Sequence, residues 1–291
     1  MRVAILGSSG YLGRNYSRAK PPAEVVLVPV DRAKIDYTDK IIFKRFLKQE
    51  KIDKIINCAG FTGKPNVDAC EQFRDLCYQL NVQLPVMLAS VCSDEKKMFF
   101  QIGSGCIYQG VPDNNYPDQG FKETDAPNFC FHHPPCSFYS GTKAEMEEKI
   151  KDIPGTSIWR LRMPFAGTWD DRNLLVKLVG YEKILEAVNS ITHLGEFINN
   201  TLKLLASEAP DGVYNCTNSG VVSNTEIVDM LCKRNIRLKK ASYFQTEKEA
   251  SLAMRSPRSA CVLDSSKIMK MGFGFRNVFE ALEDSLRELA T

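Results

Sequence analysis

The strongest constraint on the fold is a glycine-rich turn near the start of the chain. Arg2–Leu6 is an apolar strand candidate, and GSSGYLG (7–13) follows it directly and opens a helical stretch. Gly7, Gly10 and Gly13 permit a tight turn, close approach of a phosphate to the backbone and close packing of helix on strand. The helix N-terminus favours negative charge. This order predicts a dinucleotide-binding unit. Its expected cofactor contacts are Gly7, Ser9, Gly10, Tyr11, Leu12 and Gly13.

Strand and helix patterns then alternate along the first half of the chain. Apolar strand candidates lie at 2–6, 25–30, 54–57, 98–102 and 157–162. Helical patterns lie at 41–49, 70–93 and 139–151. Pro85 indicates a kink or a break within the second of these helices. Strands that alternate with helices are typical of a parallel sheet with helices on both faces, so we expect an α/β, doubly wound Rossmann fold.

The pattern changes after residue 162. Helical stretches lie at 174–179, 196–207, 224–234 and 279–289, with a strand candidate at 213–215. We therefore expect residues 1–162 to form an NADP-binding Rossmann domain to which region 190–215 returns. Residues 163–291 are expected to form mainly a smaller, C-terminal substrate-binding lobe. The proline-rich segment 108–135 has no periodicity and is expected to be a long loop.

Composition excludes several classes of protein. A net charge of +3 over 291 residues is too small to indicate nucleic-acid binding. No apolar run approaches the roughly 18 residues of a membrane span. The ten cysteines are scattered, without CxxC pairs or a signal-peptide pattern, and there are only three histidines. These features favour a cytoplasmic protein without a bound metal, a nucleic-acid partner or a membrane association.

Two further segments are expected to face the cofactor. The second strand ends in VPVDRAKID (28–36), where an Asp favours NAD and an Arg favours the 2′-phosphate of NADP. Both residue types are present; we favour NADPH because of Arg32 and leave NADH open. Small residues in NCAGFTG (57–63), after the third strand, can lie against the cofactor. The candidates from the two segments are Arg32, Asp36, Cys58, Ala59, Gly60 and Thr62, with the Cys58 side chain expected in the core.

The sequence YSGTK (139–143) carries the expected reducing chemistry. Positions i and i+4 of a helix share a face, so the ammonium of Lys143 is expected beside the phenol of Tyr139, where it would lower the phenol pKa. Such a phenol can donate the proton that a carbonyl needs when it is reduced. Ser104, at the end of the preceding strand, completes a trio. Tyr139 and Lys143 are also expected to contact the cofactor. The YxxxK pattern also occurs by chance at ordinary helix starts, but its place after this strand end favours the trio.

Several blocks along the chain carry a resemblance to a known family. They are NCAGFTGKPNVDACE (57–71), GSGCIYQG (103–110), GFKETDAPNF (120–129), SFYSGTKAEMEE (137–148), RLRMPF (160–165), RNLLVKLVGYEKI (172–184), YNCTNSGVVSNTEI (214–227) and PRSACVLDSSK (257–267). The chain resembles the extended short-chain dehydrogenase/reductases of the dTDP-4-dehydrorhamnose reductase group. Within that group it is most similar to the bifunctional nucleotide-rhamnose synthases (3,5-epimerase/4-reductase) of plants and some large viruses. The residues of the GSSGYLG turn and the insertion His132–Pro135 differ from the sequence pattern of that family.

The resemblance implies a function. It implies an enzyme that takes UDP- or dTDP-4-keto-6-deoxyglucose, epimerises carbons 3 and 5, and reduces carbon 4 with NADPH to give the L-rhamnose nucleotide. The partner is then a nucleotide-sugar substrate, and a homodimer is expected because related enzymes are often dimers. The expected compartment is the cytoplasm, or the host cytoplasm if the source is a virus.

The resemblance also implies roles for residues beyond the trio. Cys106 and Lys177 match positions implicated in epimerisation, which needs an acid and a base on opposite faces of the sugar. On an extended strand end Cys106 would point the same way as Ser104, and its thiol can exchange protons near neutrality. Asn173 matches a nucleotide-sugar contact and Arg258 a diphosphate contact. The plainer interpretations are a buried filler thiol, a solvated or phosphate-binding Lys177 and an Arg258 on a surface loop.

Two other functions stay open from the sequence. The first is a monofunctional dTDP-4-dehydrorhamnose reductase in which Cys106 takes no part. The second is a non-catalytic subunit of the kind that regulates methionine adenosyltransferase, against which the intact trio argues. The base of the nucleotide, the oligomeric state and the carbon served by each of Cys106 and Lys177 also stay open.

Overall fold

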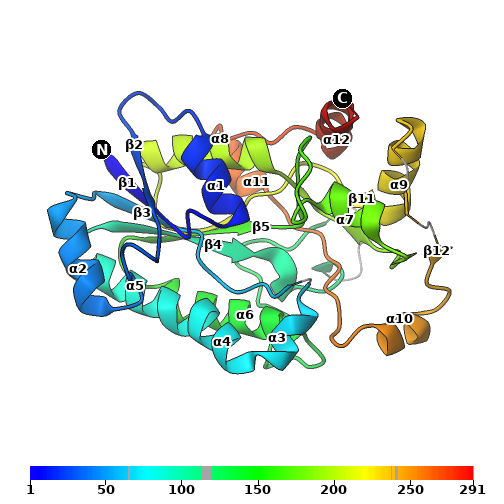
Figure 1. The fold of residues 1–291 in the computed structure, drawn as a ribbon, viewed down its shortest axis with the longest axis horizontal. Coiled ribbons are helices and arrows are strands. Elements are labelled where there is room, and N and C mark those ends of the chain that lie inside the picture. Colours follow the sequence, from blue (N-terminus) through cyan, green and yellow to red (C-terminus); the bar gives the residue numbers. More distant parts are fainter. Residues whose placement is uncertain (65, 113–118, 237, 240–241, 291) are drawn as a thin grey trace.

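The computed structural model describes residues 1–64, 66–112, 119–236, 238–239 and 242–290. Its centre is a six-stranded sheet with the order β10-β5-β4-β3-β1-β2, in which all neighbours are parallel (Figure 1). The strands are β1 (Arg2–Leu6), β2 (Val26–Val30), β3 (Lys54–Asn57), β4 (Met98–Ser104), β5 (Thr156–Leu161) and β10 (Gly212–Asn215). Helices flank this sheet on both faces, so the α/β, doubly wound fold expected from the sequence is confirmed.

Each strand of the sheet faces two cores, because alternate side chains point to opposite sides. Val3 and Ile5 belong to the core under one set of helices, and Ala4 and Leu6 belong to the core under the other. The first set is α1 (Tyr11–Arg18), α8 (Leu194–Ala206) and α11 (Ser266–Lys270). The second set is α2 (Lys40–Gln49), α5 (Leu84–Asp94) and α6 (Phe138–Ile150). Burial on both faces explains why the strands read as apolar runs rather than as alternating patterns.

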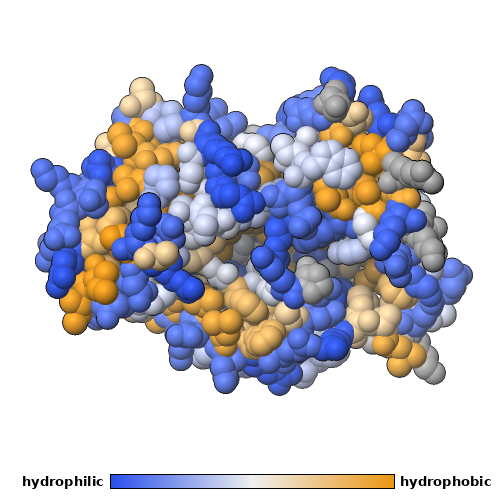
Figure 2. Space-filling model, in the orientation of Figure 1, coloured by the Kyte–Doolittle hydropathy of each residue, from blue (hydrophilic) through white to orange (hydrophobic). Residues whose placement is uncertain are grey.

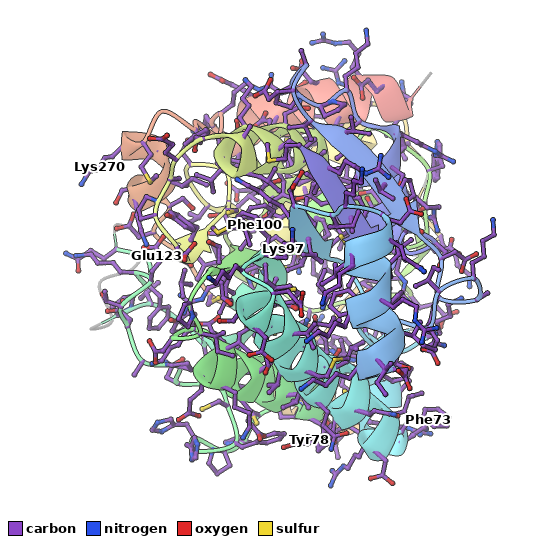
Figure 3. All side chains as sticks on the ribbon, turned by 90° about the vertical axis from the view of Figure 1, so that its left-hand side faces the viewer. Phe73, Tyr78, Lys97, Phe100, Glu123 and Lys270 are labelled. Atoms are coloured by element: carbon purple, nitrogen blue, oxygen red, sulfur yellow. The ribbon has the colours of Figure 1, made fainter. Side chains whose placement is uncertain are left out.

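The helix expected over 70–93 is divided into pieces. They are α3 (Asp68–Gln72), α4 (Arg74–Tyr78), a π-helical turn η1 (Gln79–Gln83) and α5. The break between α3 and α4 lies at Phe73, whose φ of −115° and ψ of 54° are not helical. Pro85 is the second residue of α5 and follows directly on the π-helical turn η1. Figure 3 shows Phe73 and Tyr78 at the outer edge of this helical layer, with Phe100 in the sheet layer.

Most elements that follow β5 lie outside the main sheet, and several of them share a third apolar cluster. They are β6 (Pro164–Phe165), α7 (Leu174–Gly180), β7 (Lys183–Ile184), β8 (Val188–Asn189), β9 (Thr192–His193), β11 (Val222–Ser223), α9 (Asn224–Lys233), β12 (Ser242–Tyr243), α10 (Glu247–Ala253) and α12 (Val278–Leu289). Leu175 of α7, Leu231 of α9 and Leu286 of α12 are fully buried in this cluster. β10 and α8 belong instead to the main sheet and its core. The domain boundary at residue 162 stays a prediction.

The loop expected at 108–135 lies against a distant segment. Residues 113–118 lie outside the described residues. On either side of them, isolated parallel bridges join Gly110 to Cys261 and Phe121 to Leu263. The loop is therefore held to the segment 261–263, which also lies next to the end of β4.

A buried ion pair joins α6 to the sheet. Glu147 of α6 accepts hydrogen bonds from the guanidinium of Arg160 on β5, and the two residues are only 5% and 2% exposed. We expect Glu147→Gln to lower the free energy of unfolding by about 3–5 kcal/mol, because it leaves a buried cation without its counter-charge. Urea denaturation measures this loss. Glu148→Gln, on the exposed side of the same helix, is the control. Equal stability of the two variants would contradict the prediction.

Candidate active site

The glycine turn after β1 forms a cradle with an open helix N-terminus. Gly7 has a φ of +70°, and a Cβ on it would lie 2.7 Å from the backbone nitrogen of Ala59. A Cβ on Gly13 would lie 2.2 Å from the carbonyl oxygen of Gly7. No side chain caps α1 at its N-cap residue, Gly10. The first N–H groups of α1 are therefore available to an anion, and the residues present fit the pyrophosphate of a dinucleotide.

Tyr11 adds a polar atom without a partner beside this cradle. Among the described residues its buried hydroxyl has no hydrogen-bond partner. Burial, and then the carboxylate of Asp170, raise the pKa of this phenol. Arg14 links the same region together, since it donates to the carbonyl oxygen of Ser9 at 2.9 Å and to Asp170 at 2.8 Å. Leu12 packs against the core, so its contribution to a cofactor site is limited to its backbone.

The charged residues after β2 differ in whether their side chains already make hydrogen bonds within the protein. The carboxylate of Asp36 accepts hydrogen bonds from the backbone nitrogen and the hydroxyl of Thr38, and these bonds lower its pKa. Asp31 similarly accepts from the backbone nitrogen of Ala33 at 3.0 Å. Arg32 is exposed, and its charge acts on Tyr37, whose phenol bonds with the backbone of Gly7. The charges of Arg32 and Asp31 both act on Tyr37, and the cofactor contacts expected of this segment stay predictions.

The loop that follows β3 reaches the candidate catalytic residues. A Cβ on Gly60 would lie 3.0 Å from Oδ1 of Asn81 and 3.9 Å from Nζ of Lys143. Asn81, in the π-helical turn, holds the loop by accepting from the nitrogen of Phe61 at 2.7 Å and donating to its carbonyl oxygen at 2.8 Å. The sequence interpretation did not single out Asn81. A π-helical turn often marks a functional site, but it leaves no periodicity signal that distinguishes it from an α-helix. Cys58 packs against the core, as expected.

The expected trio meets where β4 ends against α6. Ser137 caps α6 by accepting from the nitrogen of Ser140, which starts the helix so that Tyr139 and Lys143 lie one turn apart. The hydroxyl of Ser104 is close enough to the phenol of Tyr139 to act to lower its pKa. Nζ of Lys143 lies 5.9 Å from the centre of the Tyr139 ring and 3.4 Å from the carbonyl oxygen of Ile102. The three side chains therefore occupy one site.

Burial dominates the electrostatics of this trio. It raises the pKa of Tyr139 well above its usual value, and neighbouring thiols add to the effect, while Ser104 opposes it. Burial also lowers the pKa of Lys143, which is 7% exposed. The expectation that Lys143 gives Tyr139 a lowered pKa is wrong for this state of the protein, because desolvation of the phenolate outweighs the neighbouring charge. Tyr139 is therefore a protonated phenol at neutral pH.

Cys106 reaches the same site by a different geometry from that expected. β4 ends at Ser104, and Gly105–Ile107 form a 3-10 turn, η2, so the extended strand end that the sequence predicted is wrong. The hydroxyl of Ser104 accepts from the backbone nitrogen of Cys106 at 3.2 Å, which keeps the two residues side by side. Burial raises the pKa of this thiol, against the opposing effects of Ser104, Ser140, Arg162 and Lys143.

Lys177 lies on α7 beside a second cation. Burial and the charge of Arg172 lower the pKa of Lys177. Arg172 in turn donates to the hydroxyl of Thr62 and to the carbonyl oxygen of Gly63, both at 2.8 Å. Arg172 thus ties the start of α7 to the loop after β3. The sequence interpretation did not select it, although its place beside Asn173 in a block of resemblance was a signal.

Asn173 and Arg258 already have protein partners. Asn173 is fully buried and caps α7; its amide donates to the carbonyl oxygens of Ala166 and Thr168, both at 2.7 Å. Arg258 makes a two-point ion pair with Asp68 at 2.8 and 2.9 Å. Burial acts to raise the pKa of Asp68, but the bonds from Arg258 and Ser256 outweigh it and lower that pKa. The substrate contacts expected of Asn173 and Arg258 stay predictions.

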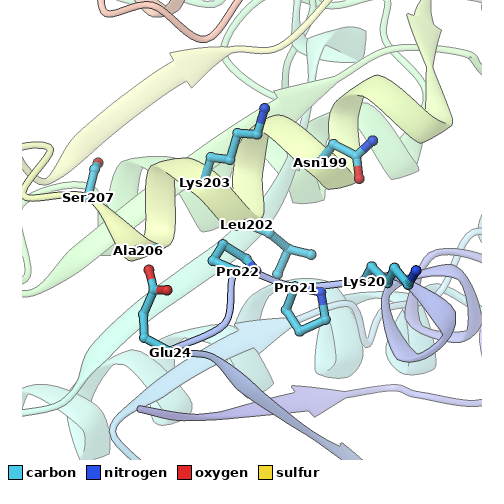
Figure 4. A pocket seen from close by; sticks show the side chains of 9 residues that line it. All are labelled: Lys20, Pro21, Pro22, Glu24, Asn199, Leu202, Lys203, Ala206 and Ser207. Carbon is cyan, nitrogen blue, oxygen red and sulfur yellow. The ribbon is translucent and has the colours of Figure 1, made fainter.

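The surface of the described residues is hollowed on the face in Figure 2 and beside helix α8. The face in Figure 2 is hollowed near its centre, between the part that carries α1 and α2 and the part that carries α7 and α9. A separate hollow of about 570 Å³ lies between the loop after α1 and helix α8 (Figure 4). Its lining contains none of the candidate site residues. In the part of the chain that the structure describes, no three metal-ligating side chains gather, and no helix is long and apolar enough to span a membrane.

The parallel sheet, the glycine cradle and the trio define a Rossmann-type fold of the short-chain dehydrogenase/reductase class. The chain belongs to the RmlD substrate binding domain family, whose model matches residues 1–291. The resemblance to the dTDP-4-dehydrorhamnose reductase group is therefore confirmed.

Relatives with related names cover most of the chain. A bifunctional dTDP-4-dehydrorhamnose 3,5-epimerase/dTDP-4-dehydrorhamnose reductase of Arabidopsis thaliana is 34% identical over 226 residues, which are 76% of this chain and 72% of that protein. A trifunctional UDP-glucose 4,6-dehydratase/UDP-4-keto-6-deoxy-D-glucose 3,5-epimerase/UDP-4-keto-L-rhamnose-reductase of the same plant is 31% identical over 274 residues. That match takes in 93% of this chain but 40% of the relative, so the chain spans about two fifths of its length.

Solved structures share the fold. The L780 UDP-rhamnose synthase from Acanthamoeba polyphaga mimivirus has a TM-score of 0.87 to this chain, with 24% identity and 99% of both chains covered. The dTDP-4-dehydrorhamnose reductase of Bacillus anthracis in complex with NADP has a TM-score of 0.79, with 21% identity and 99% of both chains covered. At these identities the likeness shows the fold alone.

Proposed function

We propose that this protein reduces a 4-keto-6-deoxy nucleotide sugar with NADPH, and that the same pocket first inverts carbons 3 and 5 of that sugar. UDP- or dTDP-4-keto-6-deoxyglucose then leaves as the L-rhamnose nucleotide. The observation that carries this proposal is that the Ser104 hydroxyl accepts from the backbone nitrogen of Cys106 at 3.2 Å and acts to lower the pKa of both the Tyr139 phenol and the Cys106 thiol. The group for reduction and the group for epimerisation therefore meet at one oxygen site. The name of the bifunctional plant relative combines the same two reactions.

Reduction needs a proton at the keto oxygen. The cradle at 7–13 and the loop at 57–63 would hold a nicotinamide dinucleotide, which would supply the hydride for carbon 4. Tyr139 donates its phenolic proton to the keto oxygen, and Ser104 donates a hydrogen bond to the same atom. The raised pKa of Tyr139 keeps this donor protonated. The ammonium of Lys143 stabilises the phenolate that remains.

Epimerisation needs one group that removes a proton and another that returns one. The lowered pKa of Lys177 favours a neutral amine, which suits a base. The raised pKa of Cys106 favours a protonated thiol, which suits an acid. At each carbon Lys177 takes the proton, the electron pair delocalises onto the keto oxygen as an enolate, and Cys106 protonates the opposite face. Ser104 and Tyr139 stabilise the enolate oxygen. Proton exchange with solvent then restores the amine and the thiol.

Deuterium exchange separates the two reactions. The protein is incubated in deuterated buffer with a 4-keto-6-deoxyglucose nucleotide, without NADPH and without an added epimerase, and deuterium at carbons 3 and 5 is measured by mass spectrometry. NADPH is then added, and its oxidation and the sugar product are followed. Exchange followed by a rhamnose product supports the proposal. Turnover of only a pre-epimerised sugar would leave a monofunctional reductase, and no turnover of either sugar would indicate a non-catalytic subunit.

Arg32 is expected to set the cofactor preference. Its guanidinium is exposed near the cradle, where it can pair with a 2′-phosphate. We expect Arg32→Gln to raise the KM for NADPH by about 10- to 100-fold, the worth of one charge-assisted hydrogen bond, and to leave the KM for NADH little changed. Steady-state kinetics with both cofactors measure this. Arg45→Gln, on the exposed face of α2, is the control. An equal loss with both cofactors would contradict the assignment.

A further inference from the structure

Arg162 is a buried cation that the proposed reaction has not used. It follows directly after β5 and is 3% exposed. Its guanidinium donates to the hydroxyl of Ser259 at 3.0 Å, to the Ser259 carbonyl oxygen at 2.7 Å and to Oδ1 of Asn189. Its Nε has no partner among the described residues. All of these acceptors are neutral, and the described part of the chain shows no carboxylate paired with Arg162.

Arg160, two residues earlier, differs from Arg162 because it has a counter-charge. It is equally buried, but it has Glu147 as its counter-charge. A buried charge without a counter-charge lowers the stability of the fold by several kcal/mol, so a functional role would explain why Arg162 is an arginine. A counter-charge that forms only during the reaction would give it such a role.

The glycines of β4 and η2 bring Arg162 next to Cys106. A Cβ on Gly103 would lie 3.5 Å from Cγ of Arg160, and a Cβ on Gly105 would lie 3.5 Å from Cδ of Arg162. The Arg162 side chain therefore runs along the backbone of the residue directly before Cys106. Its charge favours the thiolate form of Cys106.

We infer that Arg162 is a positioning residue whose guanidinium is the counter-charge of the thiolate that Cys106 becomes in the epimerisation. The inference rests on the proposed epimerase function. When Cys106 gives its proton to the enolate carbon, a C–H bond forms and the S–H electron pair stays on sulfur. Negative charge then appears beside a cation that is already in place, so little reorganisation is needed.

Other groups also act on the Cys106 thiol and must be kept constant. They are Tyr139 and Lys143 of α6, Cys136 before α6, Cys70 of α3 and Cys261 beside Gly105. The Cys261 thiol donates to the carbonyl oxygen of Gly105 at 3.1 Å and is 1% exposed, so it is distinct from Cys106 in its partner and its access. Arg162 also acts to lower the pKa of Cys261, so alkylation of Cys261 is followed in the same experiment.

Thiol alkylation tests the inference without turnover. The full-length protein is treated with iodoacetamide between about pH 7 and pH 10, and the modification of Cys106 is followed by peptide mass spectrometry. We expect Arg162→Gln to slow alkylation of Cys106 about tenfold at a given pH, the effect of raising the thiol pKa by one unit. Arg162→Lys keeps a positive charge and should restore most of the rate. Arg45→Gln is the control for an exposed arginine.

A second variant and a second measurement allow the alkylation experiment to support or overturn the inference. If Arg162→Gln does not fold, Ser259→Ala removes one acceptor that holds the guanidinium, and we expect it to slow alkylation by about threefold. An alkylation rate equal to that of the unchanged protein, in Arg162→Gln or in this substitute, would overturn the inference. Deuterium exchange is measured on the same variants. Slower alkylation in a protein that exchanges no deuterium would overturn the epimerase proposal and still support the Arg162–Cys106 pairing.

Discussion

Tyr139→Phe is expected to lower the rate of reduction by about 100- to 10,000-fold, because it removes the proton that the keto oxygen needs as hydride arrives. The phenol lies beside Ser104, desolvation raises its pKa, and Lys143 lies one helical turn away on the same face. Phenylalanine keeps the ring and its packing and loses only the hydroxyl. NADPH oxidation with a pre-epimerised 4-keto sugar nucleotide measures the effect.

The control for this variant is Tyr78→Phe. Tyr78 donates to a carboxylate oxygen of Glu145 at 2.6 Å on the outer edge of the helical layer (Figure 3), so it loses a comparable hydroxyl contact. The control is expected to keep its rate, and both variants should still bind NADPH. A Tyr139→Phe protein that reduces the sugar within about tenfold of the normal rate would refute the proton-donor assignment.

Cys106→Ser is expected to abolish exchange of deuterium into carbons 3 and 5, with a loss of about 100- to 10,000-fold, because a serine hydroxyl is a far weaker acid than a thiol. Reduction of a pre-epimerised sugar should fall much less, since its proton comes from Tyr139. The comparison therefore assigns the thiol to one half of the reaction. Cys232→Ser, at an exposed thiol of α9, is the control. Unchanged exchange in Cys106→Ser would end the proposed role of the thiol.

Signals that are local in the sequence predicted local structure well. The glycine turn lies where expected, because the φ of Gly7 and the close contact at Gly13 exclude other residues. The six strands of the central sheet begin and end within one or two residues of the expected positions, because their apolar runs are continuous, whereas the short strands β6 to β9, β11 and β12 were not predicted. The spacing of Tyr139 and Lys143 sufficed to predict one helical face.

Predictions that depended on contacts between distant segments fared less well. The direction expected for the Tyr139 pKa was wrong, because burial by several elements outweighs one nearby ammonium. The strand end expected at Cys106 was wrong, because the chain turns after Ser104. The helix break at Phe73 was not predicted, because no proline or glycine stands at that position. The ion pair of Arg258 with Asp68 could not be predicted, because it depends on how α3 packs, and the diphosphate contact of Arg258 stays a prediction.

The sequence by itself determined the order of strands and helices, the cradle at 7–13 and the residue types of the trio, because turn geometry and periodicity are properties of short segments. Only the tertiary structure decided which groups face one another. It set the Cys106 thiol against the Ser104 hydroxyl and ran the buried Arg162 along Gly105. It also put Arg172 between Lys177 and the loop after β3. Desolvation and charge pairing depend on distances between segments far apart in the chain, and packing alone sets those distances.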